Sequence, residues 1–295
     1  MKNIPLLVIV GETASGKTEL SVLLAKKFKG EIISADSVTI RRGLDIGSSK
    51  PTKTERKEVS HYLIDIIEPN EKFSVSQYKN LAEEEIKHIG NNKNLPILVG
   101  GSGLYINSIL YNYKFRTASN KYKRDYLESL DNKGLLEIAR KDRLDLSDID
   151  IKNNRRLIRH IETGGHNSRD LLTRDSTLVI GLYNSEEQRN ERVQKRVIKM
   201  IQDGLEREVR TLYLKYGLNP EIFKNIGYRE WVSYLEHKAS IDDVVQDIVK
   251  DTIYLSKKQK TWFKRNKGIH WFNYPSETSR IVDLVTSFIS EEHFN

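Results

Sequence analysis

The sequence contains no cysteine among its 295 residues. Disulfide bonds, thiolate zinc sites and cysteine nucleophiles are therefore excluded, and nothing in the composition indicates an oxidising compartment. Long apolar runs are also lacking, and none approaches the roughly 20 residues that a membrane-spanning helix requires. The early run IPLLVIV resembles a short secretory signal, but no small-residue cleavage site follows it. It predicts a buried first strand, and we expect a soluble, cytoplasmic protein with no membrane partner.

Charged residues, by contrast, are abundant, and positive residues outnumber negative ones. Lys and Arg number 49 against 41 for Asp and Glu, which gives a formal net charge of +8. This excess favours a polyanionic partner without establishing one. The length allows one substantial core with an inserted piece, whereas two large domains are not expected. We expect the chain to act as a monomer.

Short apolar runs alternate with longer helical patterns along the chain. The runs cover residues 4–10, 31–35, 62–67, 95–100, 177–183 and 269–274. This alternation predicts an α/β fold with a mostly parallel sheet flanked by helices. A long helix with apolar positions every three or four residues is predicted from about residue 241 to 265.

Between about residues 113 and 172 the strand pattern disappears and the sequence becomes helical and highly charged. We interpret this segment as an all-helical insertion domain, although ordinary crossover helices would give a similar pattern. The predicted organisation is a core over residues 1–112, the insertion over 113–172, and the rest of the core over 173–295. The last part would carry a basic C-terminal helix.

The stretch VIVGETASGKTEL contains the pattern G-x-x-x-x-G-K-[ST], directly after a predicted strand and at the start of a predicted helix. Glycines let the backbone wrap an anion, and the helix N-terminus supplies positive potential. Lys17 adds a full charge, and the Thr18 hydroxyl can ligate magnesium. A chance match in a loop is the alternative. The pattern predicts a polyphosphate site without saying which polyphosphate it takes.

Kinases and ATPases with such a loop usually carry an aspartate at the end of a later apolar strand. The matching strand here, LPILVGGSGLY, ends in glycines, which favour close approach of the backbone to a ligand. Asp65 in YLIDII is an available substitute for the metal-organising aspartate. An ordinary acidic residue at a strand end explains Asp65 equally well.

Taken together, eight segments resemble the tRNA dimethylallyltransferase (tRNA isopentenyltransferase) family, in the family's order and over nearly the whole chain. They are GETASGKT, SADSVTIRRGLDIGSSKP, HYLIDI, LVGGSGLYI, NNRRLIRHIE, RVQKRVIKMIQDGLEREV, NIGYREW and TIYLSKKQKTWFKR. The resemblance implies a P-loop core with a helical insertion that grips tRNA. It also implies transfer of a five-carbon prenyl group from dimethylallyl diphosphate to an adenine beside the anticodon.

In that family the loop holds the diphosphate of the prenyl donor rather than ATP. The resemblance implies that the diphosphate is bound by Gly11, Thr13, Ala14, Ser15, Gly16, Lys17 and Thr18. It also implies Mg²⁺ at Thr18, and catalytic roles for Thr13 and for Arg196, which would stabilise the leaving oxygen. Preorganised donors and cations lower the barrier by meeting the charge that grows on a leaving diphosphate. Without the resemblance, Arg196 would be interpreted as a solvated helix residue.

On the acceptor side the resemblance implies that Asp36, in SADS, is the general base. A carboxylate suits this role because an aromatic amine is a poor nucleophile until it shares its proton. A helix N-cap is the other interpretation of Asp36, since Asp is favoured there too. An adenine in a stacked anticodon loop must leave the stack to reach such a pocket.

Basic residues would hold the RNA around that base. Phosphate binding and base stacking need cations and aromatic rings together, as KKQKTWFKRNK provides, although Trp262 falls on the apolar stripe and is better interpreted as a core residue. The alternative for the arginines of NNRRLIRH is a solvated helix face. The implied tRNA-binding residues are Asp36, Ser37, Val38, Thr39, Ser102, Arg124, Arg155, Arg156, Arg159, Lys224, Tyr228 and Arg229.

The sequence departs from the family pattern at a few positions. Glu12 replaces the usual proline of the loop, and its charge must point away from a diphosphate. Ile253 stands where an arginine is expected, and the AKRQ turn is SKKQ, so that Lys258 replaces an arginine. The alternatives to tRNA prenylation are prenylation of free adenine nucleotides, a P-loop kinase for a small metabolite, and RNA binding without catalysis.

Overall fold

The computed structural model describes residues 4–115, 121–147, 149–165 and 174–292. Six parallel strands form one sheet in the order β3-β2-β4-β1-β5-β6. The strands are β1 (Leu6–Gly11), β2 (Gly30–Ser34), β3 (His61–Tyr62), β4 (Leu95–Gly100), β5 (Thr177–Leu182) and β6 (Ile269–Phe272). The predicted α/β class and parallel sheet are confirmed, and each of the six strands lies where an apolar run predicted it. β3 is much shorter than its run because the chain turns away after Tyr62.

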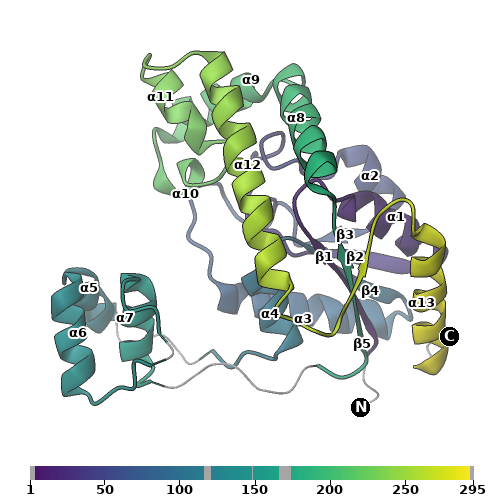
Figure 1. Cartoon of the computed structure of the whole chain (residues 1–295), viewed down its shortest axis with the longest axis horizontal. Coiled ribbons are helices and arrows are strands. Elements are labelled where there is room, and N and C mark those ends of the chain that lie inside the picture. The colour runs from purple at the N-terminus through teal and green to yellow at the C-terminus, as the bar shows by residue number, and fades with distance from the viewer. Residues whose placement is uncertain (1–3, 116–120, 148, 166–173, 293–295) are drawn as a thin grey trace. The chain divides into compact units, whose positions relative to one another are not determined.

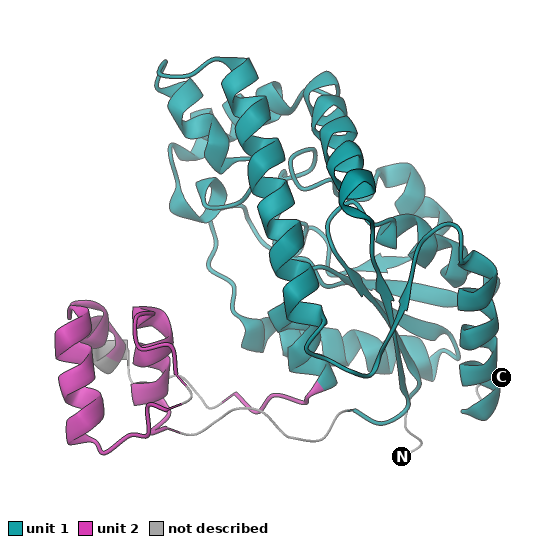
Figure 2. Ribbon diagram, in the orientation of Figure 1, with its two compact units in different colours: residues 1–110, 174–295 teal, residues 111–173 magenta. Residues whose placement is uncertain are grey.

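The chain divides into two compact units, and Figure 2 shows them in different colours. Unit 1 comprises residues 1–110 and 174–295, and unit 2 comprises residues 111–173. Unit 2 is inserted in the sequence between the fourth helix and β5. The insertion expected from the sequence covers residues 113–172.

The helices of unit 1 are α1 (Lys17–Lys27), α2 (Lys53–Glu58), α3 (Val75–Asn91), α4 (Gly103–Leu110), α8 (Glu186–Gln202), α9 (Leu205–Tyr216), α10 (Pro220–Phe223), α11 (Val232–Leu235), α12 (Ile241–Phe263) and α13 (Thr278–Glu291), with a short 3-10 helix at Arg229–Trp231. Helices of this unit flank the sheet, and α9, α10 and α11 lie together beyond one end of it (Figure 1). α12 begins with a capping box, in which Ser240 and Asp243 satisfy each other's backbone N–H groups.

β1 lies at the centre of the sheet and is buried at all six positions, as a strand covered on both faces must be. Leu7 and Ile9 belong to a core cluster that also contains residues of α1 and α13. A second cluster joins α8, α9 and α12 with Leu44, Tyr228 and Trp231. These two clusters fix α1, α8 and α12 around the carboxyl ends of the strands.

Unit 2 contains α5 (Lys121–Glu128), α6 (Asn132–Lys141) and α7 (Asn154–Glu162). Its core is small and is built from one apolar face of each helix. The buried members are Leu127, Leu135, Ala139, Leu157, Ile158 and Ile161. In the described ranges, no helix of either unit is long and apolar enough to cross a membrane.

Candidate active site

Four segments converge at the carboxyl edge of the sheet. The 11–18 loop follows β1, Asp36 follows β2, Ser102 follows β4 and Asn184 follows β5. Because the strands are parallel, these segments share one edge, where ligands of open α/β sheets bind. The Ser37 N–H donates to Ser102 Oγ at 3.1 Å, so two predicted site residues from different strands are in contact.

The loop that follows β1 is tightly wrapped. Ala14 and Gly16 have φ values of 62° and 91°, in the left-handed region. A Cβ on Gly16 would lie 2.6 Å from the ring of Tyr274, so only glycine fits there. Ser15 Oγ is buried and has no hydrogen-bond partner in the part of the chain that the structure describes.

Lys17 folds back over the loop, where its Nζ donates to the carbonyl oxygens of Gly11 at 3.1 Å and Glu12 at 2.7 Å. Burial, reinforced by the charge of Arg196 and opposed by those of Asp36 and Glu12, lowers the pKa of Lys17 to about 8. The positive charges of Lys17 and Arg196 are therefore close enough to repel each other. An anion placed between Lys17 and Arg196 would relieve that repulsion.

Arg196 comes from α8, in which Val193 and Val197 are buried in the second core cluster. The packing of these residues aims Arg196 toward the loop, and its Nε donates to Ser49 Oγ. Burial lowers the pKa of Arg196, and the nearby charge of Asp36 partly offsets this effect. The structure thus brings together Lys17, Asp36 and Arg196, which the sequence separates widely.

Asp36 is not a helix N-cap, because residues 37–40 form a turn and the next helix begins at Lys53. Its Oδ1 accepts the Val38 N–H at 2.8 Å and the Thr39 N–H at 3.3 Å, as an aspartate does in a turn that it stabilises. Among the described residues, no hydrogen bond to Oδ2 is found. One carboxylate oxygen therefore fixes the turn while the other is left to accept a proton.

Thr39 is not placed as expected. It was predicted to line a flipped base, but it is buried, and its hydroxyl lies 3.0 Å from Ser34 Oγ. Val38 packs against the second core cluster, and only Ser37 of the three is exposed. Thr39 therefore anchors the turn that carries Asp36.

Gln259 of α12 was not singled out as a site residue, although it lies within the matching segment SKKQKTWFKR. Its Oε1 accepts the backbone N–H of Thr13 at 2.8 Å and the Thr13 hydroxyl at 3.1 Å. Its Nε2 donates to the Gly101 carbonyl at 3.1 Å. Gln259 thus links the loop to the end of β4. The SKKQ segment lies inside α12 and is not a turn, so that expectation was wrong.

The glycines after β4 have a different role from the one expected. A Cβ on Gly101 would lie 2.4 Å from Gln259 Nε2, and one on Gly103 would lie 2.3 Å from Trp262 Nε1. The groups that approach this backbone belong to α12 rather than to a ligand. Trp262 therefore packs against α4, in keeping with its place on the apolar stripe.

Asp65 is not available to organise a metal. Its Oδ1 accepts Lys50 Nζ at 2.6 Å, and its Oδ2 accepts Arg56 at 2.8 Å. These two cations lower the pKa of Asp65 against the effect of burial. In the described segments no group of three or more His, Asp or Glu side chains could hold a metal ion. A magnesium ion here would need oxygen ligands from a bound diphosphate, with the exposed Thr18 hydroxyl as the protein ligand.

Tyr228, expected among the tRNA contacts, is fully buried. Its hydroxyl donates at 2.8 Å to Glu208, whose carboxylate also accepts the N–H groups of Asp45, Ile46 and Gly47. A Cβ on Gly47 would lie 2.6 Å from the ring of Tyr228. The segments GLDIGSS and NIGYRE are therefore locked together through Tyr228, which has no surface to offer to RNA.

The other two expected contacts of this region are exposed and ion-paired. Arg229 pairs with Asp251 and with Glu230, whose pKa burial raises to about 7. Lys224 pairs with Glu221. Both cations remain at the surface and can exchange these partners for phosphates.

The expected tRNA contacts of unit 2 fall into two kinds. Arg124 and Arg159 form ion pairs with Glu162, whose side chain is completely buried. Arg155 and Arg156 are exposed on α7, and in the described part of the chain neither forms an ion pair. In unit 2, one pair of arginines therefore forms ion pairs within the unit, and the other pair is exposed to solvent.

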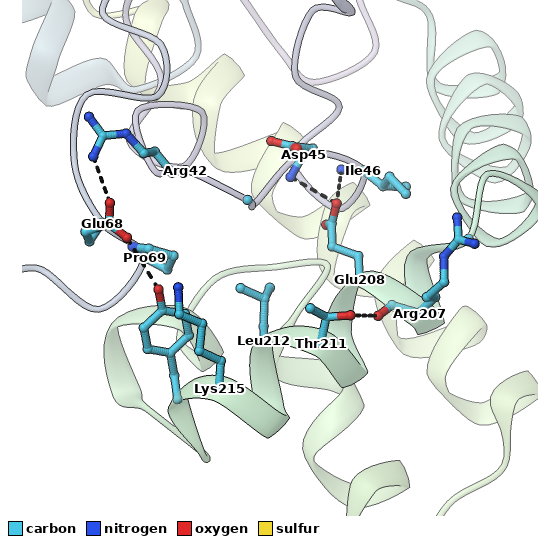
Figure 3. Close-up of a pocket in the computed structure, with 13 residues that line it drawn as sticks. Arg42, Asp45, Ile46, Glu68, Pro69, Arg207, Glu208, Thr211, Leu212 and Lys215 are labelled. Atoms are coloured by element: carbon cyan, nitrogen blue, oxygen red, sulfur yellow. Dashed lines mark hydrogen bonds and ion pairs between the residues drawn. The ribbon is translucent and has the colours of Figure 1, made fainter.

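A pocket of about 430 Å³ lies elsewhere in unit 1, against α9 and the segment 42–46 (Figure 3). Arg42 points toward Glu68, and Glu208 points toward the backbone of residues 45–46. None of the predicted site residues lines this pocket. The charged side chains that line the pocket are largely paired with other residues of the protein. The candidate active site therefore remains the edge formed by the loop, Asp36 and Arg196.

The parallel sheet, with helices on its faces and a strand–loop–helix segment at its carboxyl edge, defines an α/β protein. Residues 39–266 match the IPP transferase family. The tRNA dimethylallyltransferases of Macrococcus caseolyticus and Alkaliphilus oremlandii are 37% and 40% identical, and at least 98% of every chain is covered. A solved tRNA isopentenylpyrophosphate transferase of Bacillus halodurans is 30% identical, with a TM-score of 0.77 and coverage of 99% of this chain and 98% of that one. The chain belongs to the IPP transferase family, as the eight segments predicted.

Proposed function

We propose that this protein transfers the dimethylallyl group of dimethylallyl diphosphate to the exocyclic amine of an adenine in the anticodon loop of tRNA, releasing diphosphate. The observation that carries the proposal is the meeting of Lys17, Arg196 and Asp36 at one edge of the sheet. Two cations suit a departing anion, and a carboxylate beside them suits an incoming amine. The printed names of the relatives above support the same reaction.

In this reaction the bond between the allylic carbon and the diphosphate oxygen breaks, and a bond between that carbon and the adenine nitrogen forms. The loop N–H groups, Lys17 and Arg196 stabilise the charge that grows on the diphosphate. The proton that the amine loses passes to Oδ2 of Asp36, while Oδ1 keeps the turn in place. Gln259 accepts both the backbone N–H and the hydroxyl of Thr13, so it fixes the position of Thr13 in the loop.

Magnesium would be carried to this site by the diphosphate. Mg²⁺ keeps several waters and is commonly held by substrate phosphates with one or two protein ligands, which fits the exposed Thr18 hydroxyl. When bound, the ion would neutralise part of the leaving-group charge. Thr18→Ala should therefore raise the magnesium concentration needed for half-maximal binding of inorganic diphosphate, whereas the neighbouring Glu19→Gln should not.

Unit 2 and the exposed cations of unit 1 would hold the tRNA. Arg155 and Arg156 on α7 are placed to meet phosphates, and Arg229 and Lys224 can do the same from unit 1. The adenine must leave the stack to reach Asp36. The protein would act as a monomer in the cytoplasm, in keeping with its lack of cysteine.

The test is incubation of the purified protein with magnesium, labelled dimethylallyl diphosphate and unmodified tRNA. Label should enter the tRNA, and it should fail to enter a tRNA whose anticodon-loop adenines are replaced. Labelling of free AMP with none in tRNA would instead identify a nucleotide prenyltransferase. Tight ATP binding with phosphorylation of a small molecule, and no use of the prenyl donor, would identify a kinase.

A further inference from the structure

Glu12 is a buried acidic residue inside a loop that is expected to bind an anion. Its side chain is only 1% exposed. The carboxylate does not face the space beside Lys17 and Arg196. It accepts the Asn184 N–H at 2.8 Å through Oε1 and the Ser256 hydroxyl at 2.9 Å through Oε2, and it lies 4.0 Å from Arg189. An isolated buried carboxylate would be very costly, so these partners must hold it in one position.

The partners of Glu12 come from three different elements. Asn184 follows β5, Arg189 belongs to α8, and Ser256 belongs to α12. Asn184 and Ser256 are completely buried, and Arg189 is 4% exposed. The carboxylate therefore stands where these three elements meet the loop. A charged group that accepts hydrogen bonds from several elements fixes their relative positions more strongly than neutral contacts do.

Ser256 and Gln259 lie three residues apart on α12 and therefore share a face of the helix. They contact consecutive residues of the loop, Glu12 and Thr13. α12 is thus fastened to the phosphate loop at two adjacent points.

We propose that Glu12 is a positioning residue. Its buried carboxylate, bound to Ser256 and Asn184, holds α12 against the phosphate loop in the conformation that binds diphosphate. This inference depends on the proposed function in one respect, because it assumes that the loop binds diphosphate. Glu12 touches neither substrate, and it acts through the adjacent Thr13 and through Gln259. The Ser256 hydroxyl is needed here because the acidic side chain is present.

The experiment is a double-mutant cycle on the full chain with Glu12→Gln, Ser256→Ala and the double variant. The measured quantity is the Kd of inorganic diphosphate, obtained by calorimetry well below the thermal midpoint. Each single variant should weaken binding by about tenfold, which corresponds to about 1.4 kcal/mol. The double variant should bind about as weakly as the worse single variant, because both changes break one link.

Two matched controls separate positioning from general loss of stability. Glu31→Gln alters a carboxylate that accepts hydrogen bonds from Tyr62 and Asn94, away from the loop. Ser108→Ala removes a buried helical hydroxyl in α4. Both should lower the thermal midpoint while leaving the Kd of diphosphate unchanged. A residue with a merely structural role would behave as these controls do.

The proposal would be overturned if Glu12→Gln and Ser256→Ala bind diphosphate as tightly as the wild type. It would also be overturned if the fold-increase in Kd of the double variant equals the product of the two single-variant fold-increases. Ser256→Ala is a mild change, so it carries the test if Glu12→Gln fails to fold. Binding of diphosphate requires no prenyl transfer, so the cycle can succeed even if the tRNA labelling assay fails. A wild-type chain that does not bind diphosphate at all would overturn both proposals.

Discussion

Unit 1 contains charged side chains that are buried and paired with named partners, whereas Arg155 and Arg156 of unit 2 are exposed on α7 (the two units are shown in Figure 2). Lys50, with a side chain only 2% exposed, and Glu12 illustrate the first arrangement. Buried charges hold a fixed geometry, which chemistry needs, and exposed charges provide adaptable attraction, which a long polyanion needs. On the proposed function, the reaction would take place in unit 1, and unit 2 would supply a share of the RNA affinity.

The largest effect should come from Asp36→Asn. Asparagine can still accept the Val38 and Thr39 N–H groups, so the turn should survive, but it cannot take a proton from the amine. We expect the rate of transfer at saturating substrates to fall by about 10³-fold, within the usual range for a general base. Single-turnover transfer to tRNA is the measurement. Equal loss of tRNA affinity would show that Asp36 serves binding rather than catalysis.

The next largest effect is expected from Lys17→Ala. This change should weaken diphosphate binding by about 100-fold, because one or two charge-assisted hydrogen bonds contribute on that scale. pH gives a sharper test. The pKa of Lys17 is about 8 without ligand, so the side chain is protonated below that pH and loses its charge above it. The part of the affinity that Lys17 supplies should therefore be fully present well below pH 8 and be lost as pH rises beyond 8. If Lys17→Ala keeps the same pH profile, another group is responsible.

In unit 2 the double variant Arg155→Ala, Arg156→Ala should weaken tRNA binding by about tenfold and leave the rate at saturating tRNA unchanged. Loss of two phosphate contacts should reduce the slope of log Kd against log salt concentration by about 2. Filter binding over a salt series is the measurement. Arg140→Ala, an exposed arginine on α6, is the matched control. A salt slope identical to that of the wild type would remove α7 from the RNA interface.

The smallest effect separates a buried residue from an RNA contact. Tyr228→Phe removes the hydroxyl that donates to Glu208 and should cost about 1 kcal/mol of folding stability, the usual value for one hydrogen bond. Because Tyr228 is fully buried, tRNA affinity should not change. Urea unfolding and filter binding measure the two quantities. A drop in tRNA affinity without loss of stability would restore Tyr228 to the interface.

Local patterns predicted much of this fold. The six apolar runs and the long helical stripe each mark an element because burial acts on the residues of one segment. The strand, loop and helix at residues 6–27 were also predicted correctly, because the glycines and Lys17 that mark them are close in sequence. These features depend on neighbours in the sequence.

The parts that could not be predicted depend on contacts between distant segments. Gln259 reaches Thr13 across 246 positions, and Asp65 is paired with Lys50 and Arg56 instead of facing a metal. The resemblance placed Tyr228 among the tRNA contacts, and nothing in its own segment shows that Glu208 and Gly47 enclose it. A single sequence names the residue types but does not show which of them meet.

The link between Gln259 and Thr13 has a consequence for synthesis on the ribosome. The phosphate loop emerges about 240 residues before the helix that completes it. A nascent chain can form β1 and its neighbours early, but its catalytic centre remains unfinished until α12 has left the exit tunnel. Such distant pairing slows folding, because loop closure must come before the contact can contribute. A chain that ends before α12 should therefore lack the contact that fixes Thr13.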